Sequence, residues 1–164
     1  MKSKKEKVQK TNAMRLLDAA GIEYETASYE YDESDLSGVH AAAELGAAPE
    51  TVFKTLVTRN NKNEFFVFVI PVAETLDLKK AAKVSDSRSI EMIHVREIED
   101  ITGYIRGGCS PIGMKKPFPS YVDETASLYD KIYFSAGKRG VQIILPPDKL
   151  LEASHAKYAD LIAY

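Results

Sequence analysis

The chain has 164 residues and a net charge of −2, and it is 45% hydrophobic, 28% charged and 9% aromatic, which is typical of a soluble globular protein of one domain. Its longest apolar run, residues 65–72, is far shorter than the roughly 20 residues of a membrane-spanning helix, and no apolar run follows the lysines near its start, so neither a membrane span nor a secretory signal is expected. The single cysteine, Cys109, excludes an internal disulfide and indicates a reducing, cytoplasmic compartment.

Hydrophobic periodicity and turn residues divide the chain into short helices and strands. Thr11 is a typical N-cap for the first helix, and Gly21 is a typical stop. The expected elements are helix 13–20, strand 22–29, helix 38–45, strands 52–58 and 65–70, helix 76–82, a weaker helix 95–101, strands 132–134 and 141–145, and helix 148–154. Strand 65–70 is apolar on both faces and is therefore expected at the centre of a sheet. Because strands and helices do not alternate strictly, the pattern predicts an α+β domain with a mixed sheet.

The near-neutral net charge hides a segregation of charge along the chain. Residues 1–10 hold five lysines and one glutamate, and they are predicted to form a basic N-terminal tail before a domain over residues 11–164. Residues 23–50 carry eight acidic residues and no lysine or arginine, whereas residues 103–140 carry six basic residues against three acidic ones. The basic segment could therefore bind a polyanion, although ordinary solvent-exposed faces would give the same charge pattern.

The usual signatures of metal and nucleophilic sites are missing from the sequence. Its three histidines lie far from one another and from Cys109, and no C-x-x-C or H-E-x-x-H motif occurs, so no metal or other cofactor is expected. The nucleophile elbow G-x-S-x-G is also absent. Cys109 lies among small residues with no histidine near it in the sequence, which favours a buried structural thiol over a catalytic one.

Two features could serve a ligand, although each also has an ordinary structural explanation. Gly107 and Gly108 could present backbone N–H groups to a carbonyl oxygen or a phosphate, although a pair of turns would look the same. Lys54 lies inside an apolar strand pattern. It either reaches the surface or occupies a pocket, where loss of water suits it to anchor an anion or a carbonyl. The turn at 135–140 is likewise either a cationic surface turn or a rim that grips a phosphate backbone.

Four segments follow one another along almost the whole chain: VFKTLV at 52–57, LDLKKAAK at 76–83, TGYIRGGCSPIG at 102–113 and SAGKRG at 135–140. Together they resemble the YbaK/EbsC family of Cys-tRNA(Pro) deacylases. The resemblance implies a single α+β domain with a mixed, barrel-like β-sheet surrounded by helices, as in the editing insertion domain of bacterial prolyl-tRNA synthetases. It also implies an activity in trans, the removal of cysteine wrongly attached to tRNA(Pro), because one pocket cannot strongly exclude an amino acid of similar volume.

The resemblance also assigns roles to individual residues. Lys54, Gly107 and Gly108 match the catalytic positions, where the lysine orients the aminoacyl ester or the terminal adenosine and the glycines face the ester carbonyl. The remaining positions are Tyr29, Ser135 and Gln142 for substrate binding, and Arg106, Lys138 and Arg139 for tRNA binding. The substrate thiol is expected to attack the ester itself, so no protein nucleophile is needed. Gln142 stands where some members carry an acidic residue, which leaves the amino acid preference open between cysteine and another small residue such as alanine.

The partner expected from the resemblance is aminoacyl-tRNA, with prolyl-tRNA synthetase as a possible second partner and with neither DNA nor a membrane. Two alternatives belong to other classes of protein. One is a non-catalytic tRNA- or synthetase-binding module that keeps the fold, and the other is a nucleotide- or small-anion-binding protein that uses the same glycines and lysine. Retention of Lys54, Gly107 and Ser135 favours the enzyme, since a pure binding module would not need this set.

Overall fold

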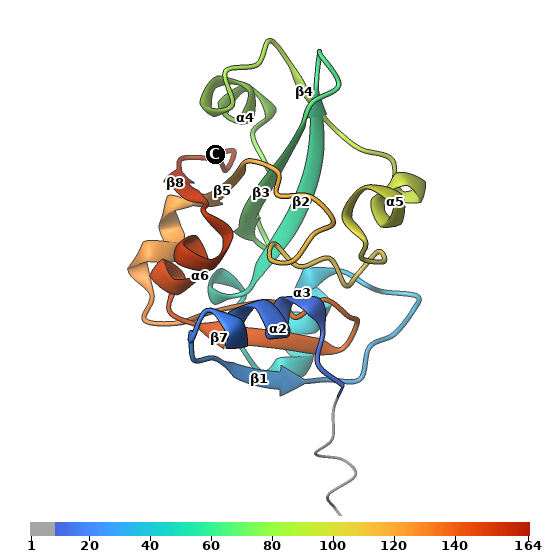
Figure 1. Cartoon of the computed structure of the whole chain (residues 1–164), viewed down its shortest axis with the longest axis vertical. Coiled ribbons are helices and arrows are strands. Elements are labelled where there is room, and N and C mark those ends of the chain that lie inside the picture. The colour runs from blue at the N-terminus through green and yellow to red at the C-terminus, as the bar shows by residue number, and fades with distance from the viewer. Residues whose placement is uncertain (1–8) are drawn as a thin grey trace, which may run out of the picture.

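The computed structural model describes residues 9–164 (Figure 1). Its helices are α2 (Asn12–Ala19), α3 (Gly38–Leu45), α4 (Leu78–Val84), α5 (Ile98–Thr102) and α6 (Pro147–Ser154), with 3-10 turns η1 (Pro49–Thr51), η2 (Val95–Glu97) and η3 (Glu124–Leu128). Its strands are β1 (Glu25–Ser28), β2 (Phe53–Asn60), β3 (Phe65–Pro71), β4 (Ile90–Met92), β5 (Ser120–Asp123), β6 (Ile132–Ser135), β7 (Val141–Leu145) and β8 (Lys157–Ala159). Each helix and strand predicted from the sequence is present, with ends that differ by at most three residues.

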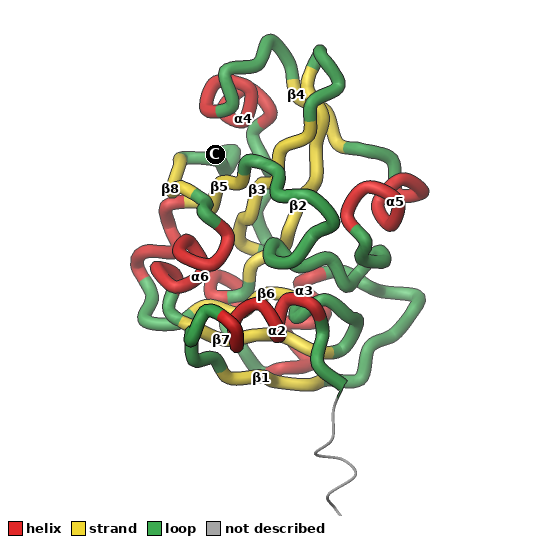
Figure 2. The backbone as a smooth tube through the Cα atoms, viewed as in Figure 1, coloured by secondary structure: helices red, strands yellow, loops and turns green. Residues whose placement is uncertain are grey.

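The strands form two sheets, and the predicted α+β fold is confirmed. A five-stranded sheet has the order β4-β2-β3-β5-β8, and a three-stranded sheet has the order β1-β7-β6. The five-stranded sheet is mixed, because β3 pairs antiparallel with β2 and parallel with β5. The expected mixed, barrel-like β-structure is made of these two sheets, which an isolated bridge between Val52 and Tyr133 joins. Figure 2 shows β1, β6 and β7 beside α2 and α3, at the foot of the long β2–β3 hairpin.

The central strand β3 separates two hydrophobic clusters. Val67 and Val69 face the main core, where the five-stranded sheet packs against the three-stranded sheet and α2. Phe68 and Ile70 face the opposite side and pack against α4 and the C-terminal segment, including Leu161. Alternate side chains of a strand point to opposite faces, so burial of both sets requires a layer on each side. The prediction that this strand is central is confirmed by its place in the sheet.

The first helix is fixed to two loops that border the site described below. The Thr11 hydroxyl caps α2 by accepting a hydrogen bond from the Met14 N–H at 3.2 Å, and it donates to the Ala136 carbonyl at 2.5 Å. The Asn12 side-chain amide donates to the Gly113 carbonyl at 2.8 Å. A capping residue thus also holds α2 against the turn after β6.

Three strands were not predicted. They are β4, β5 and β8, each of three or four residues. Such short segments show too few alternations for a periodic pattern. The predicted basic tail over residues 1–10 lies almost entirely outside the described residues, which begin at position 9. In the part of the chain that the structure describes, no helix combines the length and apolarity needed to cross a membrane.

Candidate active site

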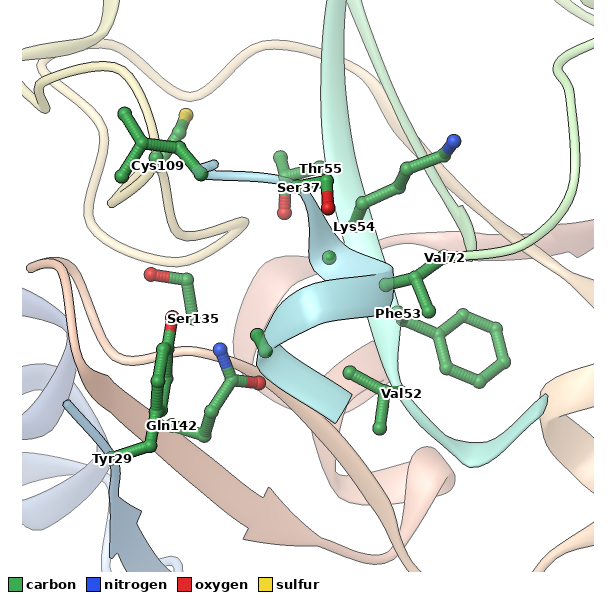
Figure 3. Close-up of a pocket in the computed structure, with 14 residues that line it drawn as sticks. Tyr29, Ser37, Val52, Phe53, Lys54, Thr55, Val72, Cys109, Ser135 and Gln142 are labelled. Atoms are coloured by element: carbon green, nitrogen blue, oxygen red, sulfur yellow. The ribbon is translucent and has the colours of Figure 1, made fainter. Parts of the chain in front are cut away.

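A pocket of about 120 Å³ lies between the start of α3, the first residues of β2, the loop after α5 and the ends of β6 and β7 (Figure 3). Of the predicted catalytic and substrate-binding residues, five line it: Tyr29, Lys54, Gly107, Ser135 and Gln142. They come from four segments that are far apart in the sequence. The structure therefore brings together residues that the sequence could connect only through resemblance.

Strand pairing explains how one wall of the pocket forms. Ser135 and Gln142 are register partners across β6 and β7, and Gln142 is opposite Ala27 of β1. Two residues after Ala27, the Tyr29 N–H donates to the Gly140 carbonyl at 2.9 Å, which continues this pairing past the end of β1. The Val52–Tyr133 bridge then places the backbone at the start of β2 beside this wall.

Lys54 is half-buried at the edge of the pocket. Burial lowers the pKa of its ammonium group because the charged form loses water, and the nearby Glu74 carboxylate partly offsets this shift. Figure 3 shows the side chain running from β2 away from Ser135 and Gln142. The cation therefore stands apart from the neutral polar wall, so a bound ligand that contacts both would have to extend between them.

Two buried oxygen atoms in the pocket have no hydrogen-bond partner among the described residues. They are Oε1 of Gln142, a residue only 7% exposed, and Oγ1 of Thr55. Buried polar atoms are almost always hydrogen-bonded, and leaving one unpaired costs about 1–3 kcal/mol. Both atoms are therefore suited to a polar ligand. Thr55 was not predicted as a site residue. Its place next to Lys54 in an otherwise apolar strand could have indicated one.

The two predicted glycines have different functions in the structure. Gly107 lines the pocket and has a φ of +85°, a conformation that favours glycine. The N–H of Gly108 is already donated to the Ile105 carbonyl at 2.9 Å, so its predicted use as an oxyanion donor is not supported. A Cβ at Gly108 would lie 3.0 Å from the backbone of Lys138. Gly108 therefore allows the loop to approach the turn after β6, and Gly107 remains the candidate donor.

The three residues predicted to bind tRNA differ in their exposure and in their contacts. The Nε atom of Arg139 donates to the Arg106 carbonyl at 2.8 Å, and its Nη1 lies 3.9 Å from Oε2 of Glu33. Arg139 thus connects the loop that carries Gly107 to the loop that carries Glu33. Arg106 is exposed beside the pocket, and Lys138 is half-buried in the same turn as Arg139. Of the three, Arg106 has the most accessible position for a phosphate.

Cys109 also lines the pocket, and burial raises the pKa of its thiol to about 11. A hydrogen bond with Thr102 opposes this shift but does not cancel it. The thiol is therefore protonated at neutral pH, and a protonated thiol is a poor nucleophile. Among residues 9–164, no three side chains of His, Cys, Asp or Glu gather as ligands of a metal ion would.

We expect alkylation of Cys109 by iodoacetamide to be slow at pH 7.5 and to accelerate until the pH passes about 11, the raised pKa of the thiol. In urea-unfolded protein the same reaction should reach its plateau near pH 9, the ordinary value. Because the folded pKa is the higher one, the thiol should also cost the fold stability as the pH rises from about 9 to 11. Equal midpoints for folded and unfolded protein would contradict the burial of this group.

Comparison with known proteins places this pocket in a family. Residues 36–153 match the family model of the aminoacyl-tRNA editing domain. The chain belongs to the aminoacyl-tRNA editing family. Each pocket residue named above except Tyr29 lies inside the matched range. The resemblance expected from the four sequence segments is therefore confirmed at the level of the family.

Named relatives of this editing domain extend the comparison. EbsC of Enterococcus faecalis, a candidate Cys-tRNA(Pro)/Cys-tRNA(Cys) deacylase, is 46% identical over 159 residues, which cover 97% of each chain. The uncharacterised protein YwhH of Bacillus subtilis is 24% identical over 128 residues, or 78% of this chain and 81% of YwhH.

Solved structures of similar proteins support the fold. A candidate trans-editing enzyme for prolyl-tRNA synthetase matches 93% of this chain, with 96% of its own chain covered, a TM-score of 0.82 and 25% identity. The structure of the hypothetical protein APE2540 matches 93% of this chain, and all of its own chain is covered. Its TM-score is 0.85 and its identity is 22%. The second likeness bears on the fold alone.

Proposed function

We propose that this editing domain is a trans-acting deacylase that removes cysteine from Cys-tRNA(Pro). The observation that carries the proposal is that Lys54, Gly107 and a neutral polar wall surround one pocket of about 120 Å³. We further propose that it acts in the cytoplasm on aminoacyl-tRNA, with prolyl-tRNA synthetase as the source of the mischarged substrate. The 46% identity to EbsC over nearly the full length supports this choice of substrate.

The size of the pocket favours a small amino acid. A volume of about 120 Å³ is slightly below the cavity of about 150 Å³ that is known to hold one benzene ring. A cysteine or alanine side chain fits this space, and the rest of an aminoacyl-tRNA would lie outside it.

The chemistry requires no group of the protein to become covalently attached. The substrate thiol loses its proton and its sulfur attacks the ester carbonyl carbon, forming a C–S bond. The C–O bond to the ribose then breaks, the ribose oxygen takes up a proton, and the cysteine leaves as a cyclic thioester. In this proposal the Gly107 N–H stabilises the developing negative charge on the carbonyl oxygen, and the Lys54 ammonium orients the adenosine end of the ester.

The neutral wall of the pocket suits the remaining polar group of the substrate. The α-ammonium of an aminoacyl ester carries only donors, and the unpaired Oε1 of Gln142 is an acceptor. The hydroxyl of Tyr29 and that of Ser135 flank the same wall in Figure 3. Pairing the ammonium with Gln142 would satisfy an atom that is otherwise buried without a partner.

The test is a deacylation panel with tRNA(Pro) charged with cysteine, alanine, serine or proline, together with Cys-tRNA(Cys). We expect release from Cys-tRNA(Pro) at least tenfold faster than release of serine or proline. The pocket volume also admits alanine, so preferential release of alanine would redirect the amino acid choice while keeping the enzyme. No release from any charged tRNA, despite intact binding, would instead favour the non-catalytic module.

A further inference from the structure

A second cavity adjoins the pocket and differs from it in character. It has a volume of about 250 Å³ and lies between β2, β4, η2 and α5. Its walls are mostly aliphatic, with Val57, Ile93 and Ile98 among them. Only two residues line both the cavity and the site pocket, and these are Thr55 and Cys109.

The alternation of β2 explains why the two spaces are neighbours. Phe53, Thr55 and Val57 project from the same face of the strand, because successive side chains alternate. Phe53 lines the pocket, Val57 lines the apolar cavity, and Thr55 between them lines both. Cys109, from the loop after α5, is the second shared residue, and Figure 3 shows it with Thr55 at the edge of the pocket farther from Gln142.

We propose that Thr55 and Cys109 form a partition that sets the upper size limit of the amino acid accepted by the pocket. This inference rests on the proposed deacylase function. With the partition present, the space available to a substrate side chain is the pocket of about 120 Å³. With it removed, the same side chain would continue into about 250 Å³ of aliphatic space. Thr55 and Cys109 are then specificity-determining residues, although neither takes part in breaking the ester.

The aliphatic lining decides which substrates an opened pocket would gain. Unbranched apolar side chains such as that of methionine could leave their first atoms in the pocket and bury the rest beside Val57 and Ile93. Charged side chains would gain nothing, because the cavity offers them few partners. Apolar pockets separate ligands that differ by one methylene by about 10- to 200-fold, so removing a size limit of this kind is measurable.

The experiment measures binding rather than turnover, so that it does not depend on the substrate thiol. Non-hydrolysable 3′-amide analogues of cysteinyl-adenosine and methionyl-adenosine are titrated calorimetrically into the full chain. We expect Thr55→Ala/Cys109→Ala to improve the affinity for the methionyl analogue, relative to the cysteinyl one, by about tenfold or more over wild type. Each single alanine variant should give a smaller change in the same direction.

Two control variants distinguish the partition from a general loosening of the fold. Thr55→Val keeps the volume of the side chain and removes its hydroxyl from both complexes alike, so both affinities can change but their ratio should stay that of wild type. Val57→Ala enlarges only the apolar cavity and should also keep it. Circular dichroism and thermal unfolding establish that each variant is folded, and the single variants carry the test if the double variant is not.

The results that would overturn the inference are specific. An unchanged affinity ratio in the folded alanine variants, or an equal shift in Val57→Ala, would show that Thr55 and Cys109 set no limit. A wild-type chain that binds neither analogue and releases no cysteine from Cys-tRNA(Pro) would contradict the proposed function itself. The two failures are therefore distinguishable.

Discussion

Replacing Lys54 with alanine should lower kcat/KM for Cys-tRNA(Pro) by about 10²- to 10³-fold, the range seen when one preorganised electrostatic group is removed from an active site. Burial lowers the pKa of the half-buried Lys54 ammonium group, and the attraction of Glu74 only partly offsets this cost of burying the charge. Thermal unfolding should therefore change little or improve slightly. The dependence of the single-turnover rate on enzyme concentration measures kcat/KM, and its plateau at saturating enzyme measures the chemical step.

The matched control for this variant is Lys79→Ala, which removes the same charge from an exposed position on α4. It should reproduce any effect of net charge on tRNA binding and leave the single-turnover rate near that of wild type. If Lys54→Ala and Lys79→Ala were equally active, Lys54 would have no place in the site. If both lost activity equally, the loss would report weaker attraction of tRNA and not chemistry.

Replacing Gly38 with alanine should lower the free energy of unfolding by about 1–3 kcal/mol, as expected for overpacking of a well-packed site. The added Cβ would lie 2.3 Å from Cγ1 and 2.8 Å from Cβ of the buried Val72. Alanine favours a helix by about 1 kcal/mol over glycine, but this gain is smaller than the cost of the clash. Both residues line the pocket, so deacylation should also fall, by about tenfold or more if the strain displaces the start of α3.

Gly46→Ala is the control for this change, because Gly46 ends the same helix and a Cβ there would meet no atom within 4 Å. Its φ of +69° still costs some stability, roughly 1 kcal/mol, but the pocket should be undisturbed and deacylation normal. Combining Gly38→Ala with Val72→Ala should recover part of the lost stability, since neighbouring substitutions that share one clash are not additive. Strict additivity, measured by denaturant unfolding, would contradict the contact.

The predicted elements with strong local signals agree with the structure. The cap at Thr11, the apolar run at 65–70 and the glycine after residue 45 depend on neighbouring residues alone, and each marks an element that is present. The short strands β5 and β8 depend on partners distant in the sequence, since β5 pairs with β3 and β8 pairs with β5. No local pattern can reveal such pairing.

The site was predicted from resemblance, and the structure adds what resemblance could not supply. The sequence does not show that the Gly108 N–H is already bonded to Ile105, because that bond depends on how the loop turns. Nor does it show that Arg139 contacts Arg106 instead of solvent. The sequence also does not show that the oxygens of Thr55 and Gln142 lack hydrogen-bond partners, since burial without a partner is a property of three-dimensional packing.

The pairing of Ala27 with Gln142 has a consequence for how the protein is made. A growing chain that has reached residue 130 already contains Lys54 and Gly107, but it lacks β6 and β7, and β1 has no partner to pair with. Closing so long a loop is entropically costly and is rewarded only once both ends are present. We therefore expect editing activity to arise abruptly at the end of synthesis, and any chain that stops before β7 to be inactive.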